Sequence, residues 1–123
     1  MATVRYLVSD VARAMSFYVD QLGFEPQQEM LPAFAAVRRG DLELWLAGPA
    51  SSAARAMPDG SRPVSGGWNR FVVEVDDLAA LVERLRSSGA PFRNDVVSGP
   101  GGKQILVDDP DGNPIELFEA RGG

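Results

Sequence analysis

The sequence predicts an α+β fold built from two tandem copies of one β-α-β-β unit. Two observations support this prediction. Short segments of alternating apolar residues are separated by two segments whose apolar residues recur at helical spacing. The order of these elements also occurs twice, because "LVSDVARAM" matches "VEVDDLAAL" and "GDLELWL" matches "GNPIELF". An internal repeat of about fifty residues is a stronger signal than any single element.

The first copy, about residues 1–48, begins with a predicted strand at 4–8. Ser9 and Asp10 then provide a helix N-cap signal. Apolar residues at helical spacing predict a helix to about residue 22, which Gly23 ends. The remaining predicted strands are 34–38 and 42–47, and we also consider one at 25–29.

The second copy, about residues 68–120, follows the same order. A strand is predicted at 71–75, an N-cap at Asp76 and Asp77, and a helix at 78–87. The segment "SGPGG" at 98–102 has the composition of a phosphate-binding loop, but it opens no helix, so it is interpreted as a hairpin loop. The remaining predicted strands are 92–97, 103–107 and 114–119, the last after the turn at 109–112.

Between the copies, residues 49–67 are rich in Ala, Gly, Pro and Ser. A connection of this length is usually a mobile linker or a functional lid, and we interpret this one as a linker. Trp68, at its end, is the residue we expect to dock against the fold. The chain is therefore treated as one domain of two modules.

Composition excludes several classes of function. The formal net charge of −5, with a sequence pI of about 4.6 and no basic cluster, argues against a nucleic-acid partner. No apolar run is long enough to cross a membrane, and the N-terminus lacks a signal-peptide pattern, so we expect a cytoplasmic protein. The chain has no Cys and no His. It therefore lacks thiolate chemistry, the commonest metal ligand and the commonest general base.

Alternation divides each predicted strand between two faces. One face is apolar and should pack against the helices. The opposite face combines charged and aromatic residues, which suits a ligand site better than a dry core. The residues of this second face that we predict to bind a ligand, together with two candidates near it, are Arg5, Phe34, Glu43, Trp45, Trp68, Arg70, Glu116 and Phe118.

Three motifs resemble the vicinal oxygen chelate superfamily, which includes glyoxalases, bleomycin-resistance proteins and extradiol dioxygenases. They are "VSDVARAMSFYVDQLGF", "VDDLAALVERLRSSGAPF" and "DPDGNPIELFE", and they cover nearly the whole chain. The resemblance implies two βαβββ modules that form a cup-shaped, partly open eight-stranded sheet with the helices outside. It also implies a homodimer.

The resemblance further implies four positions at which metal-using members of this superfamily hold a cation. Here they are Thr3 and Glu43 in the first copy and Arg70 and Glu116 in the second. A guanidinium replaces a ligand at position 70. We therefore hypothesise that Arg70 pairs with Glu116 or Glu43 in place of a metal, and we expect no cofactor. A structural ion pair is the simpler reading of Glu116.

The first functional hypothesis is a metal-free protein that binds an aromatic or cationic small molecule, resembling the antibiotic-sequestering bleomycin-resistance proteins. The second is a metal-independent isomerase, epimerase or cyclase in which Glu43 or Glu116 transfers a proton. A metal-dependent glyoxalase or dioxygenase is the third, because its ligands are largely missing from this chain.

Overall fold

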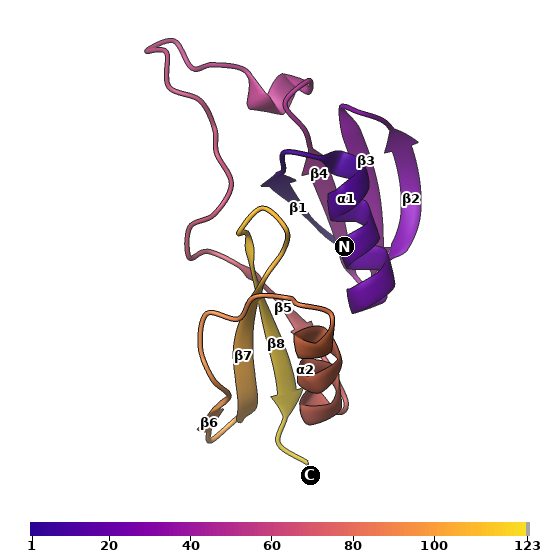
Figure 1. The fold of residues 1–123 in the computed structure, drawn as a ribbon, viewed down its shortest axis with the longest axis vertical. Coiled ribbons are helices and arrows are strands. Elements are labelled where there is room, and N and C mark those ends of the chain that lie inside the picture. The colour runs from indigo at the N-terminus through magenta and orange to yellow at the C-terminus, as the bar shows by residue number, and fades with distance from the viewer. Residues whose placement is uncertain (123) are drawn as a thin grey trace. The chain divides into compact units, whose positions relative to one another are not determined.

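A computed structural model describes residues 1–122, and the chain divides into two compact units. Unit 1 is Met1–Gly66, and unit 2 begins at Gly67. Each unit contains one four-stranded mixed sheet and one main helix (Figure 1). The predicted class is confirmed: the fold is α+β with two βαβββ-like modules, and the eight strands are divided equally between two sheets.

Unit 1 has the strand order β1-β4-β3-β2, in which β1 and β4 are parallel and the other neighbours are antiparallel. The segment considered as an additional strand is β2, an exposed edge of this sheet. The elements of the unit are β1 (Ala2–Leu7), α1 (Val11–Ser16), a π-helical continuation (Phe17–Gln21), β2 (Glu25–Met30), β3 (Phe34–Arg39), β4 (Leu42–Ala47) and a short 3-10 turn (Ser52–Ala54).

The helix of unit 1 begins and ends where its sequence signals predict. The Asp10 carboxylate accepts a hydrogen bond from the Arg13 backbone N–H at 3.1 Å, so Asp10 is the N-cap. Gly23 ends the helix with φ of 73°, a conformation that costs glycine little. The last turn is π-helical, and within it Tyr18 is fully buried with its ring edge-to-face against Phe24.

The core of unit 1 lies between α1 and one face of its sheet. Leu44, Leu46 and Val37 alternate onto this face and are fully buried, and α1 contacts both β3 and β4. The chain approaches the helix closely at Gly48, where an added Cβ would lie 2.8 Å from Val11 Cγ2. The opposite sheet face carries the charged and aromatic residues of the predicted site.

Unit 2 has the strand order β5-β8-β7-β6, with β5 and β8 parallel. Its apolar face packs under α2, where Ile115, Leu117 and Ile105 are fully buried. The predicted hairpin at 98–102 is confirmed, because β6 and β7 pair across Pro100 and Gly101. The elements of the unit are β5 (Phe71–Glu74), α2 (Leu78–Ser87), β6 (Val97–Gly99), β7 (Gly102–Asp108) and β8 (Pro114–Ala120).

Two carboxylates from different elements satisfy the N-terminus of α2. Asp77, the predicted N-cap, accepts a hydrogen bond from the Ala80 N–H at 3.1 Å. Glu119, from β8, accepts one from the Leu78 N–H at 2.8 Å. This bond, and then a hydrogen bond from Lys103, hold the pKa of Glu119 below its ordinary value. Glu119 thereby ties the helix to the sheet.

The predicted strand at 92–97 is wrong. Phe92 forms a single bridge with Val107, and the next paired residue is Val97 in β6. Between them the Asn94 side chain, rather than a backbone carbonyl, accepts the Leu106 N–H at 2.9 Å. This side-chain contact replaces the backbone ladder, and the segment leaves the sheet at that point.

Asp109 organises the turn before β8. It is 1% exposed, and its Oδ1 accepts hydrogen bonds from the backbone N–H groups of Asp111 and Asn113, both at 2.9 Å. The Asn113 side chain donates to Oδ2 at 3.0 Å. These hydrogen bonds hold the turn in one conformation. The turn in turn determines where β8 starts and which of its side chains face the site.

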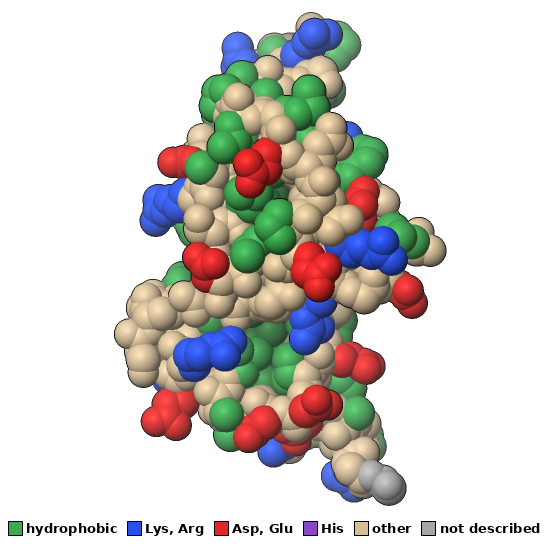
Figure 2. All heavy atoms as spheres, turned by 90° about the vertical axis from the view of Figure 1, so that its right-hand side faces the viewer, with side chains coloured by type: hydrophobic (Ala, Val, Ile, Leu, Met, Phe, Trp, Pro, Cys, Tyr) green, Lys and Arg blue, Asp and Glu red, His purple; other side chains and the backbone are tan. Residues whose placement is uncertain are grey.

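The helices and one face of the surface show how apolar and charged residues are distributed. None of the helices over residues 1–122 is long and apolar enough to cross a membrane. On the face that Figure 2 shows, Lys and Arg side chains are scattered among Asp and Glu and form no continuous basic patch.

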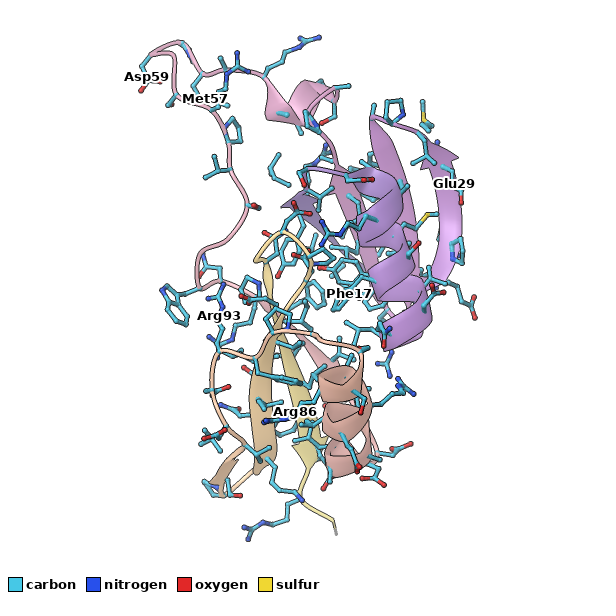
Figure 3. The ribbon with its side chains drawn as sticks, in the orientation of Figure 1. Phe17, Glu29, Met57, Asp59, Arg86 and Arg93 are labelled. Atoms are coloured by element: carbon cyan, nitrogen blue, oxygen red, sulfur yellow. The ribbon has the colours of Figure 1, made fainter. Side chains whose placement is uncertain are left out.

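The segment that leaves β4 extends away from the sheet, and Met57 and Asp59 lie at its outer end (Figure 3).

Candidate functional site

In unit 1, strand register brings the predicted site residues onto one face. Thr3 lies beside Glu43 and Arg5 beside Trp45 in the parallel β1–β4 pair. Phe34, in β3, projects from the same face, since it lies two residues before the Ala36 that pairs with Trp45. This sheet face is opposite the one that packs against α1, and β4 places Glu43 and Trp45 at its centre.

Trp45 is the centre of a contact cluster on that face. Its indole Nε1–H donates a hydrogen bond to Glu43 Oε2 at 2.8 Å. The Arg5 guanidinium lies over the ring, with Cζ 4.9 Å from the centroid, and the Phe34 ring packs edge-to-face at 5.8 Å. The result is an aromatic surface with one guanidinium and one carboxylate held at its margin.

In unit 2, Arg70 and Glu116 form the ion pair that the sequence allowed. Arg70 lies one residue before β5, and its Nε and Nη2 both donate to Glu116 Oε1, at 3.1 and 2.9 Å. The two side chains are 31% and 12% exposed, respectively. Because the pair is partly shielded from water, the guanidinium neutralises a carboxylate that is costly to leave alone.

Two apolar residues share the face of unit 2 that carries this pair. Val72, beside Glu116 in the β5–β8 register, is 49% exposed. Phe118 follows Glu116 on the same face of β8 and lies half-buried beside Gln104 of β7. This surface is therefore also partly apolar. Glu74, beside Phe118 in the β5–β8 register, adds a second carboxylate to it.

Trp68 is docked by a residue that the sequence analysis missed. The Arg93 guanidinium lies over its ring, with Cζ 4.5 Å from the centroid. Arg93 in turn donates to Asp108 Oδ1 at 2.6 Å, to the Gly67 carbonyl at 2.6 Å and to the Gly112 carbonyl at 2.9 Å. No periodic signal in the sequence marks Arg93, because its acceptors are remote in the chain.

The four implied metal positions do not fit a divalent cation. Glu116 Oε1 receives two N–H groups from Arg70, and a fixed positive charge at position 70 repels a second cation. In the other unit, Glu43 Oε2 is engaged by the Trp45 indole, and Thr3 supplies only a hydroxyl. Over residues 1–122, no group of three or more Asp and Glu side chains is placed to hold a metal ion.

Two hollows within the units lie away from the predicted residues. A hollow of about 450 Å³ in unit 1 is lined by residues around the start of α1 and by Leu31, Pro32 and Pro49. Another of about 450 Å³ in unit 2 is lined by residues 86–95, including Arg86 and Phe92. Neither is lined by any of the eight predicted ligand-binding residues.

The fold and the paired modules define a class of protein, and the comparisons agree with it. Residues 1–117 match the model of the Glyoxalase/Bleomycin resistance protein/Dioxygenase superfamily. The chain belongs to this superfamily, which is the family that the three sequence motifs resemble.

Relatives within the superfamily differ in their described roles. The chain is 26% identical to TnmS3, an antibiotic binding protein from Streptomyces sp. CB03234, with a TM-score of 0.73 and coverage of 97% of this chain and 93% of that one. It is 27% identical to the bleomycin-binding protein of Streptomyces verticillus, whose structure was solved with copper(II)-bleomycin, with a TM-score of 0.63 and coverage of 98% and 95%.

An enzyme also appears among the relatives. The chain is 27% identical to a probable chloroplastic lactoylglutathione lyase of Arabidopsis thaliana, over 97% of this chain. The match covers 35% of that enzyme, so this chain spans about a third of its length.

Proposed function

We propose that this protein binds a planar organic small molecule without a metal ion and sequesters it without chemical conversion. The observation that carries the proposal is the Arg70–Glu116 pair, in which a guanidinium occupies one of the four positions that the family resemblance implies for a metal. A carboxylate that is neutralised by a neighbouring side chain needs no bound ion. The half-buried aromatic surface of unit 1 is available for a ligand.

The face of unit 1 supplies the recognition chemistry. Trp45 and Phe34 offer apolar ring surface, Arg5 offers N–H donors, and Glu43 offers an acceptor through its second oxygen. Within the described residues, Glu43 Oε1 and the Arg5 N–H groups make no hydrogen bond to protein, so they are available to a ligand. Such a set suits a flat ligand that carries both a donor and an acceptor at its edge.

The antibiotic-binding relatives support the same class of ligand. Two structural relatives at 26% and 27% identity bind antibiotics, according to their descriptions. We carry over only the class, an antibiotic-like organic molecule, and the prediction of a homodimer and a cytoplasmic location accompanies it.

A thermal-shift screen against planar, antibiotic-like compounds tests the proposal. A ligand at a hundred times its Kd should raise the free energy of unfolding by about 2.7 kcal/mol, which is visible as a higher Tm. The Arg5→Ala variant should lose much of that shift, whereas Arg13→Ala, an exposed arginine of α1, is the matched control and should keep it. Failure of every compound to raise the Tm of the wild-type protein would contradict the proposal.

A metal-independent enzyme is the second candidate, and one observation favours it. Glu116 Oε2, like Glu43 Oε1, accepts no hydrogen bond from the described residues, so each can take a proton from a substrate. Arg70 would then stabilise the developing negative charge. Once a ligand is known, Glu116→Gln separates the two functions, since a sequestering protein shows no turnover before or after the change.

A further inference from the structure

Trp68 combines high exposure with a fixed position. The residue is 69% exposed, although an indole is among the largest apolar groups a protein can leave in water. It follows Gly66 and Gly67, which have φ angles of 103° and 90°. An exposed side chain is often mobile, but the contacts of Trp68 hold its ring in place.

The anchor is Arg93, and Arg93 is itself immobilised. Its side chain is 16% exposed, and its three nitrogens donate to Gly67, which precedes β5, and to Asp108 and Gly112 at the β7–β8 turn. A planar guanidinium bound at all three nitrogens has a defined plane. Arg93 Cζ lies over the ring of Trp68, 4.5 Å from its centroid. Figure 3 shows Arg93 beside the segment that leads into β5.

The backbone on either side of the indole is also held by arginine. Arg93 Nη1 binds the carbonyl of Gly67, the residue before Trp68. Arg70 Nη1 contacts the carbonyl of Trp68 itself at 3.4 Å while its other N–H groups bind Glu116. Two guanidinium groups, each paired with a carboxylate, therefore fix both the ring and the main chain that carries it.

We propose that Trp68 is a stacking platform for a planar, uncharged aromatic ring and that Arg93 is the residue that positions it. This inference rests on the proposed function and names the chemical class of ring that this residue recognises. One indole face lies on Arg93, and the high exposure of the residue leaves the other for a ligand. Holding the ring in place before binding reduces the entropy lost on binding.

The charge of the ligand ring follows from the same geometry. Arg93 already places a cation on one face of the indole. A second cation on the opposite face would be repelled by it, although an isolated indole would attract one. A neutral flat ring has no such penalty and stacks well on an indole. The platform should therefore prefer a neutral ring to a cationic ring of the same size.

The test uses the two tryptophans separately. Trp45→Phe leaves Trp68 as the only tryptophan of the chain, because the sequence contains 2. Riboflavin, a neutral planar tricycle whose own emission is quenched on stacking, is the probe, and proflavine, a planar tricyclic cation, is its charged counterpart. We expect saturable quenching of riboflavin by the wild-type protein, with clearly weaker binding of proflavine, and loss of riboflavin quenching in Trp68→Ala. Quenching that is absent in the wild-type protein, or unchanged in Trp68→Ala, would overturn the proposal.

Arg93→Met, in the Trp45→Phe background, tests the positioning role. We expect at least a fivefold loss of riboflavin affinity and, without riboflavin, a lower fluorescence anisotropy of Trp68 because its ring becomes mobile. Arg86→Met is the matched control, since Arg86 stacks on Phe92 at 5.0 Å in the same unit and should leave both values unchanged. Equal affinities in the two variants would overturn the role of Arg93.

Arg93→Lys keeps the test decisive if Arg93→Met does not fold by circular dichroism. A lysine retains the charge but cannot reach three acceptors at once, so an intermediate loss of affinity is expected, and unchanged affinity contradicts the proposal. A compound that raises the Tm of the wild-type and Trp68→Phe proteins equally would exclude the platform while leaving the proposed function intact. Failure of all compounds with the wild-type protein would contradict the function itself.

Discussion

Arg70 directs two N–H groups, Nε and Nη2, at one oxygen of Glu116, at 3.1 and 2.9 Å. The contact joins the residue before β5 to the middle of β8, two positions that are 46 residues apart in the chain. Both N–H groups bind one carboxylate oxygen, so the second oxygen accepts no hydrogen bond from the guanidinium. The pair thus neutralises charge on this sheet face and still leaves an acceptor there.

Arg70→Met should destabilise the fold by about 1–2 kcal/mol, because Glu116, 12% exposed, loses both of its charged hydrogen bonds. Chemical denaturation of the variant and of the double variant with Glu116→Gln measures the effect. The double variant should recover part of the loss, since no carboxylate is then left unpaired. Strictly additive losses would show that the two side chains do not interact in solution.

Glu119→Gln should lower stability at neutral pH and leave it unchanged in acid. The hydrogen bond from the Leu78 N–H, and then Lys103, hold the pKa of Glu119 below its ordinary value of 4.5. A carboxylate whose pKa is lowered by folding stabilises the protein above the ordinary value, and that stability is lost as the pH falls through the lowered pKa.

The measurement for Glu119 is the free energy of unfolding of wild-type and variant proteins between pH 7 and pH 3. The difference between them should be largest at pH 7 and shrink below about pH 4.5. Glu83→Gln, which removes the same charge from the exposed surface of α2, should show no such trend. A difference independent of pH would contradict the assigned contact.

Gly48→Ala should destabilise the protein by about 1–3 kcal/mol, because a Cβ there would lie 2.8 Å from Val11 Cγ2 and 2.9 Å from the Pro32 carbonyl oxygen. Thermal unfolding monitored by circular dichroism checks this. Gly99→Ala is the control, since no atom lies within 4 Å of its added Cβ. A Gly48→Ala protein as stable as the control variant would show that α1 can move away from the strand.

Glu43→Ala should weaken ligand binding about threefold to tenfold, because the Trp45 indole then loses the acceptor that orients it. Glu43→Gln retains a carbonyl acceptor and should bind nearly as well as the wild-type protein. In a Trp68→Phe background the emission of Trp45 reports its orientation directly. If Glu43→Gln lost binding as fully as Glu43→Ala, the negative charge, and not the indole contact, would be the contribution of this residue.

Most of the fold was predictable because its elements have clear periodicities. The strand at 42–47 and the helix at 78–87 have the predicted bounds, since each has one uninterrupted apolar pattern and a recognisable cap or turn beside it. The strand predicted at 92–97 failed for a local reason. The side-chain oxygen of Asn94 accepts the hydrogen bond from the Leu106 N–H. The composition of the segment does not indicate that a side chain takes the place of a backbone carbonyl there.

The candidate site was predictable only where strand register determined it. Alternation along neighbouring parallel strands puts side chains of both strands on the same face of the sheet. It brings Arg5 to Trp45 in unit 1 and Arg70 to Glu116 in unit 2. Arg93 escaped prediction because its contacts depend on how a bridge and two turns come together in three dimensions. Arg93 also lay inside the strand predicted at 92–97, so nothing in the sequence marked it as a contact of Trp68.

The division of the chain also has a physical signal in the sequence. Gly66 and Gly67 both adopt positive φ where unit 1 ends and unit 2 begins. The long segment before them contains a local turn, in which Asp59 accepts hydrogen bonds from the Ser61 N–H at 3.0 Å and hydroxyl at 2.6 Å. These two bonds lower the pKa of Asp59. The predicted boundary of module two at residue 68 remains a prediction.

The central claim is that the Arg70 guanidinium serves in place of a bound ion. Its most direct test is the metal content of untagged protein after equilibration with Mg²⁺, Mn²⁺, Ni²⁺ and Zn²⁺ and removal of the free ions, measured by mass spectrometry. The account predicts no stoichiometric ion on the wild-type chain. One divalent ion per chain, retained by the wild-type protein and lost in Glu116→Gln, would contradict it.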